Sequence, residues 1–102
     1  MLCTSVTATD VAGCLVQIDE AAAAGVDVVE LRLDFLSEHF EVAELVSRCA
    51  SRGVRSIATY RPTWEGGQYD GDEDARLQVL VEASRSGASY VDLEYKLGEE
   101  RL

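Results

Sequence analysis

The sequence has 102 residues and a net charge of −10 at pH 7, which argues against nucleic acid or an anionic membrane surface as a partner. Its hydrophobic content of 47% is typical of a folded domain, and no apolar run approaches the ~20 residues that a membrane span requires. The three cysteines lack metal-binding spacing, so we expect free thiols, no metal site and a soluble intracellular protein.

The first third of the chain predicts a strand, a helix and a second strand. Residues 2–8 (LCTSVTA) are the predicted first strand. Asp10 can cap a helix that continues to about Ala24, and Gly25 is a suitable C-terminal stop. Residues 26–36 (VDVVELRLDFL) are rich in β-branched residues and predict the second strand.

The same order of helix, glycine and strand repeats twice more. Ser37 is the expected cap of a second helix, which ends at Gly53 before a strand over residues 54–61. After Pro62 and a glycine-rich loop over 63–72, a third helix leads to Gly87 and to a last strand over 89–95. The apolar faces are predicted to be Phe40, Leu45, Val46 and Cys49 on the second helix, and Leu77, Leu80, Val81 and Ser84 on the third.

Strands that alternate with helices of this length predict right-handed βαβ units and a parallel sheet. An open doubly wound sheet and a barrel both begin in this way. The alternation along the second strand favours the barrel, because Val29 and Leu31 lie on one face while Glu30, Arg32 and Asp34 lie on the other. A barrel holds its active site at the carboxyl ends of the strands. We therefore predict an α/β chain that forms the N-terminal half, about four βα units, of a (β/α)8 barrel, with residues 1–102 as one partial domain.

Two polar segments are candidate functional sites. Glu30, Arg32 and Asp34 would be costly to bury unless they pair or bind a ligand, so an internal ion-pair network is the alternative explanation. Arg61 stands at the end of the third strand, and Glu65 follows in a loop that is longer than most connections in α/β units. An ordinary ordered surface loop is the alternative there.

Three motifs together resemble a known family. ELRLD, TYRP followed by WEGGQYDGDE, and YVDLE are similar to type I 3-dehydroquinate dehydratase, the Schiff-base class, and the likeness extends from CTSVTA to DLEY. The segment WEGGQYDGDE is especially similar to the dehydratase half of plant bifunctional dehydratase–shikimate dehydrogenases. The resemblance implies a lyase of the shikimate pathway that converts 3-dehydroquinate to 3-dehydroshikimate and water. It implies no cofactor, a small-molecule substrate, and a plastid location in a plant or a cytoplasmic one in a bacterium; a homodimer stays open.

The resemblance also assigns roles to residues of this sequence. Glu65 matches the catalytic carboxylate that pairs with a histidine base. Residues that match contacts to the substrate's hydroxyls and carboxylate are Ser5, Glu30, Arg32 and Arg61.

The imine-forming lysine and the histidine of the family belong to strands five and six, which have no counterpart among these residues. Lys96 is the only lysine and His39 the only histidine, and neither matches the family's catalytic positions. We expect His39 on the surface, Lys96 in a solvated loop, and no activity from the 102 residues alone. The open alternatives are a non-catalytic half-barrel that acts by association or complementation, and another barrel lyase such as a Schiff-base aldolase.

Overall fold

One parallel sheet carries the fold in the computed structural model, which describes residues 2–62, 67, 69 and 71–92. Neighbouring strands are hydrogen-bonded in chain order, and a helix follows each of the first three. The strands are β1 (Cys3–Val6), β2 (Val28–Arg32), β3 (Arg55–Thr59) and β4 (Tyr90–Asp92). The helices are α1 (Val11–Ala23), α2 (Val42–Ser51) and α3 (Glu73–Arg85), and a 3-10 helix, η1 (Leu33–Phe35), follows β2.

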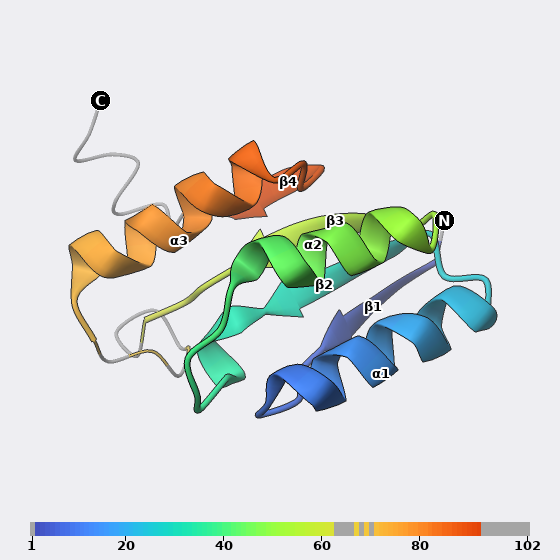
Figure 1. Ribbon diagram of the computed structural model, residues 1–102, viewed down its shortest axis with the longest axis horizontal. Coiled ribbons are helices and arrows are strands. Elements are labelled where there is room, and N and C mark those ends of the chain that lie inside the picture. The colour runs from blue at the N-terminus through green and yellow to red at the C-terminus, as the bar shows by residue number, and fades with distance from the viewer. Residues whose placement is uncertain (1, 63–66, 68, 70, 93–102) are drawn as a thin grey trace.

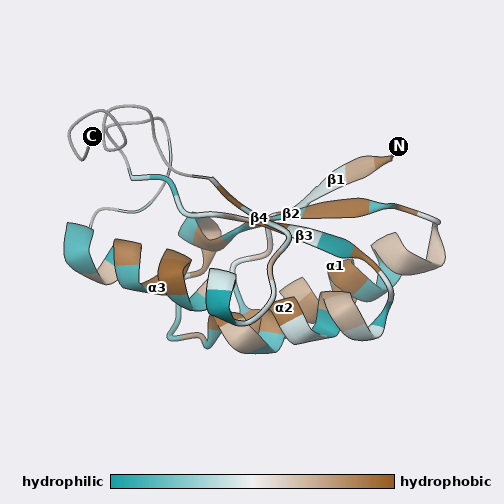
Figure 2. Ribbon diagram, turned by 90° about the horizontal axis from the view of Figure 1, so that it is seen from above, coloured by the Kyte–Doolittle hydropathy of each residue, from teal (hydrophilic) through white to brown (hydrophobic). Residues whose placement is uncertain are grey.

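The arrangement of layers distinguishes a barrel from a doubly wound sheet. In a doubly wound sheet the strand order reverses and helices cover both faces. Here the order is β1-β2-β3-β4, and α1, α2 and α3 all lie on one face (Figures 1 and 2). The opposite face is not covered by any described helix. This sequential, one-sided arrangement is that of the first strands and helices of a (β/α) barrel, as the side-chain alternation of β2 predicted.

Capping residues set the ends of the helices. The Asp10 carboxylate accepts a hydrogen bond of 2.8 Å from the Gly13 backbone N–H and so begins α1 as predicted. Gly25 and Gly53 follow α1 and α2 with φ of +79° and +74°, a conformation that residues with a Cβ rarely adopt. The chain can therefore reverse after each helix and return to the sheet.

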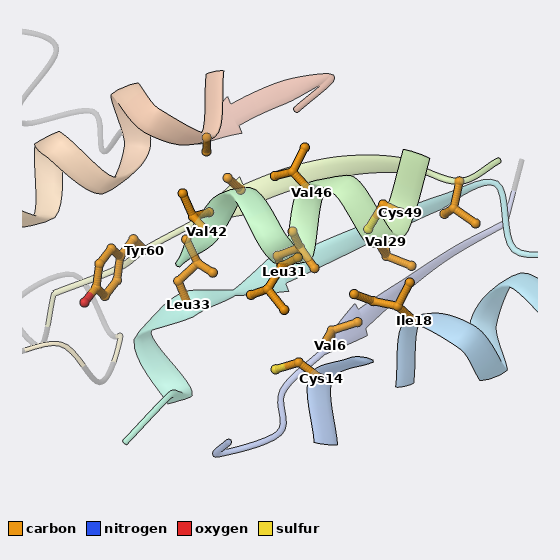
Figure 3. Close-up of a cluster of buried hydrophobic side chains, with 14 of the residues drawn as sticks. Val6, Cys14, Ile18, Val29, Leu31, Leu33, Val42, Val46, Cys49 and Tyr60 are labelled. Carbon is orange, nitrogen blue, oxygen red and sulfur yellow. The ribbon is translucent and has the colours of Figure 1, made fainter. Parts of the chain in front are cut away.

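The hydrophobic core lies between the sheet and the three helices. Val29 and Leu31 of β2 point toward the helices and are buried, with Val6 and Ala58 beside them on the adjacent strands. The helices contribute most of the remaining apolar side chains, and Val54 and Tyr60 on either side of β3 complete the cluster (Figure 3). The most completely buried side chains on the helices are Cys14, Ile18, Leu45, Val46, Cys49, Leu80 and Ala83.

Two predictions about the helices were wrong. Ser37 does not cap α2, because its hydroxyl donates to the Thr9 carbonyl at 3.0 Å and the helix begins only at Val42. On α3 the buried residues are Arg76, Leu80 and Ala83, whereas Val81 is 43% exposed and Ser84 faces solvent. The second strand is also shorter than predicted, since the chain turns into η1 after Arg32.

Candidate active site

A hydrogen-bonded carboxylate lies on the sheet face that the helices leave uncovered. Ser5 and Glu30 are register partners on β1 and β2, and the Ser5 hydroxyl donates to Glu30 Oε1 at 3.0 Å. Thr59 on β3 donates its hydroxyl to Glu30 Oε2 at 2.9 Å. Each carboxylate oxygen is therefore held by a hydroxyl from a different neighbouring strand. The sequence predicted Ser5 and Glu30 as site residues, and the structure brings them together.

Arg32 lies at the carboxyl end of β2 and forms an ion pair with Asp34. Its Nε and Nη2 donate to the two carboxylate oxygens of Asp34 at 3.2 Å and 3.0 Å. The Asp34 side chain is fully buried, whereas that of Arg32 is 19% exposed. The guanidinium also lies 4.9 Å from the ring centroid of Phe35. The three residues of the predicted polar face therefore differ in role. Asp34 makes an internal ion pair that holds the guanidinium of Arg32 at the strand end, whereas Glu30 is held by hydroxyls of the neighbouring strands.

The described part of the β3–α3 connection is tightly packed around Arg61. The Tyr69 backbone N–H donates to the Arg61 carbonyl at 3.1 Å, and the Gly67 N–H donates to the Pro62 carbonyl at 2.9 Å. A Cβ built on Gly67 would lie only 2.1 Å from the Arg61 carbonyl oxygen, so this position accepts no side chain. Arg61 lies two residues beyond the end of β3, and its own carbonyl and that of Pro62 are both hydrogen-bonded to the connection. Glu65, the predicted catalytic carboxylate, lies outside the described residues.

Other titratable candidates stay apart from this face. His39 is exposed, as predicted, and its Nε2 lies 3.1 Å from Glu41 Oε1. Cys14 and Cys49 are buried free thiols, and burial raises the pKa of Cys49 to about 11, so it is not ionised at neutral pH. Burial likewise raises the pKa of Tyr60 to about 12. Lys96 lies outside the described residues.

Thr59 and Arg76 are the polar residues that sequence reasoning missed. Thr59 is fully buried yet aims its hydroxyl at Glu30, and Arg76 is a fully buried cation on α3. The sequence assigned Thr59 no role. In the structure Thr59 is the register partner of Arg32, so its side chain lies on the same sheet face as Glu30 and Arg32.

The arrangement suits a small, hydroxylated anion. A carboxylate that is already oriented can accept hydrogen bonds from ligand hydroxyls, and the Arg32 guanidinium at the end of β2 is a cation that can bind a ligand carboxylate. Within residues 2–62, 67, 69 and 71–92, no cluster of three potential metal ligands is present. None of the helices in that part of the chain has the length and hydrophobicity to span a bilayer.

Comparison with known proteins identifies the family. The model of the type I 3-dehydroquinase family matches residues 2–102. The chain belongs to this family. The bifunctional 3-dehydroquinate dehydratase/shikimate dehydrogenase of Arabidopsis thaliana, named as chloroplastic, is 36% identical over 100 residues, covering 98% of this chain and 17% of that protein. The 3-dehydroquinate dehydratase of Desulfotalea psychrophila is 45% identical over 76 residues, covering 74% of this chain and 32% of the relative.

Solved structures place the fold within the family's barrel. The 3-dehydroquinate dehydratase of Aquifex aeolicus superposes with a TM-score of 0.77 at 28% identity, covering 97% of this chain and 43% of that one. The type I enzyme of Clostridium difficile gives a TM-score of 0.81 at 23% identity, covering 97% and 42%. The four strands and three helices therefore correspond to the N-terminal half of a (β/α)8 barrel, and the chain spans less than half the length of these relatives.

Proposed function

We propose that this chain supplies substrate-binding residues to a 3-dehydroquinate dehydratase, the lyase that converts 3-dehydroquinate to 3-dehydroshikimate and water. The observation that carries the proposal is the Glu30 carboxylate, held by the Ser5 and Thr59 hydroxyls on the face opposite the helices. Asp34 is also held at both oxygens but is fully buried, whereas Glu30 is only half-buried, so its oriented carboxylate can accept hydrogen bonds from a ligand on that face. The match of residues 2–102 to the family supports the same assignment.

The chemistry divides between these residues and groups that the family places on later strands. A lysine amine condenses with the substrate ketone, releases water and forms an imine, which acidifies the neighbouring C–H bond. A histidine takes that proton, the electron pair forms a C=C bond, and the hydroxyl one carbon further leaves as water after protonation. Hydrolysis of the imine then returns the lysine and the enone product.

Residues of this chain would bind and orient the substrate. Glu30 and Ser5 bind substrate hydroxyls, whereas Arg32 and Arg61 provide cations at the ends of adjacent strands. Glu65, by its match to the family, orients the histidine base. We propose a cofactor-independent reaction, with location following the source: plastid stroma in a plant and cytoplasm in a bacterium.

The test is an assay of the complete product of the reading frame that encodes these residues. We expect 3-dehydroquinate to yield an enone that absorbs in the near ultraviolet, and borohydride to trap a substrate adduct on a lysine outside residues 1–102. The 102-residue chain by itself should give neither product nor adduct, because Lys96 and His39 do not match the catalytic pair. A complete product that is inactive would support the non-catalytic half-barrel, and turnover with an adduct on Lys96 would overturn the assigned roles.

A further inference from the structure

A fully buried arginine lies on α3, close to the connection that carries Arg61. Arg76 has no exposed surface, and its Nε and Nη2 donate to the two oxygens of Glu73, each at 2.7 Å. Its third nitrogen, Nη1, donates to the Tyr60 carbonyl at 2.7 Å. Burying a cation is costly even when it is paired, and an apolar side chain of similar volume is often at least as stabilising. A fold that required only packing would not need arginine at this position.

The contacts of Arg76 join the end of β3 to the start of α3. Tyr60 directly precedes Arg61, so the hydrogen bond to its carbonyl constrains the peptide unit that leads into Arg61. The rings of Tyr60 and Tyr69 pack edge to face with centroids 4.6 Å apart. Tyr69 in turn donates its backbone N–H to the Arg61 carbonyl and its hydroxyl to the Asp72 carbonyl, the latter at 2.6 Å. The backbone on both sides of Arg61 is thus tied to the first turn of α3.

We propose that Arg76 is a positioning residue, which fixes the backbone around Arg61 and so sets where the Arg61 guanidinium meets the substrate. This inference rests on the proposed function, in which Arg61 binds the substrate. The planar guanidinium of arginine is needed because two of its nitrogens donate to the Glu73 carboxylate while the third donates to the Tyr60 carbonyl in another direction. Lysine carries the same charge on a single nitrogen and cannot reproduce both contacts in one geometry.

A double-mutant cycle separates positioning from general stability. In the complete reading-frame product, we expect Arg76→Lys to raise KM for 3-dehydroquinate about tenfold or more, with a smaller change in kcat, because small misplacements of a binding group are expensive. In an Arg61→Ala background the same substitution should change KM less than about twofold, since the group it positions is gone. Arg85→Lys is the matched control, an exposed arginine at the end of the same helix. Equal factors in both backgrounds would overturn the proposal.

Hydrogen exchange tests the positioning role independently of activity. Arg76→Lys should accelerate exchange of the Gly67 and Tyr69 amides, which donate within the connection, more than that of the Leu31 amide in the central sheet. Glu73→Gln removes the charge from the other half of the anchor and should act in the same direction even if Arg76→Lys folds poorly. Unchanged protection at both amides, or equal loss throughout the sheet, would overturn the role of Arg76. Absence of turnover in the wild type would refute the proposed function instead, and the exchange rates would still decide whether Arg76 holds the connection.

Discussion

Replacing Thr59 by valine would remove one of the two hydroxyls that hold the Glu30 carboxylate, while leaving a side chain of similar shape in the sheet. The hydrogen bond measures 2.9 Å from Thr59 Oγ1 to Glu30 Oε2. Hydrogen bonds to charged groups contribute about 1.5–3 kcal/mol, and Glu30 is only half-buried, so water can partly replace the lost donor. We therefore expect the lower end, about 1.5 kcal/mol, which corresponds to roughly a tenfold loss in kcat/KM for 3-dehydroquinate.

Thr59→Ser is the control that distinguishes orientation of Glu30 from packing. Serine keeps the donor but deletes a methyl group from a fully buried side chain, at a cost of about 1 kcal/mol in the free energy of unfolding. Steady-state kinetics of enone formation and urea unfolding followed by circular dichroism measure the two effects on the complete product. We expect Thr59→Ser to be less stable with nearly wild-type kcat/KM. The reasoning fails if Thr59→Val keeps wild-type kcat/KM, or if Thr59→Ser loses as much.

Two further predictions concern the surface and the candidate site. The hydrogen bond from Arg48 at 2.7 Å lowers the pKa of Asp19 below its usual 3.8, so its stabilising effect is complete above that value and is lost as the pH falls through the folded-state pKa. Asp19→Asn should lower the urea midpoint at neutral pH, more than Glu20→Gln does, and the difference should shrink as the pH falls below 3.8 and vanish once Asp19 is protonated in the folded state; a difference that does not shrink on acidification would contradict the assigned cause. In the complete product, Arg61→Ala should raise KM about 30-fold, from ~2 kcal/mol of charge-assisted binding, whereas Glu65→Ala should chiefly lower kcat. An effect of Glu65→Ala on KM alone would exclude its role in proton transfer.

Features that depend on neighbouring residues in the sequence were predictable. The Asp10 cap and the glycine after each helix follow from local backbone chemistry, and all are present in the structure. The alternation of Val29 and Leu31 with Glu30 and Arg32 follows from the two-residue period of a strand, and it indicated the barrel before strand order was known. Motif resemblance added the family, which the comparisons confirm.

Features that depend on contacts distant in sequence were not predictable. Ser37 has the chemistry of a helix cap, but Thr9 lies beside it in the fold and offers a carbonyl acceptor, so the helix begins five residues later at Val42. The early end of the second strand is a local feature instead: the chain turns into η1 after Arg32, and Asp34, two residues further on, pairs with Arg32. The strand pattern had placed both side chains on one extended face and offered the ion pair only as the alternative explanation.

The error on α3 has the same cause as the one at Ser37 and bears most directly on the site. Apolar spacing selected Leu77, Leu80, Val81 and Ser84. Leu80 is buried as predicted, but Val81 and Ser84 are exposed, and Arg76 and Ala83 are buried instead. Hydrophobic periodicity assigns every arginine to solvent, because it cannot count partners supplied by another element; here the Tyr60 carbonyl comes from the end of β3, 16 residues earlier. The desolvation cost of burying a charged side chain is offset only where several hydrogen-bond acceptors surround it. The acceptors that surround a buried charge also fix its position closely. Around Arg76 they include the Tyr60 carbonyl, which belongs to the residue directly before Arg61.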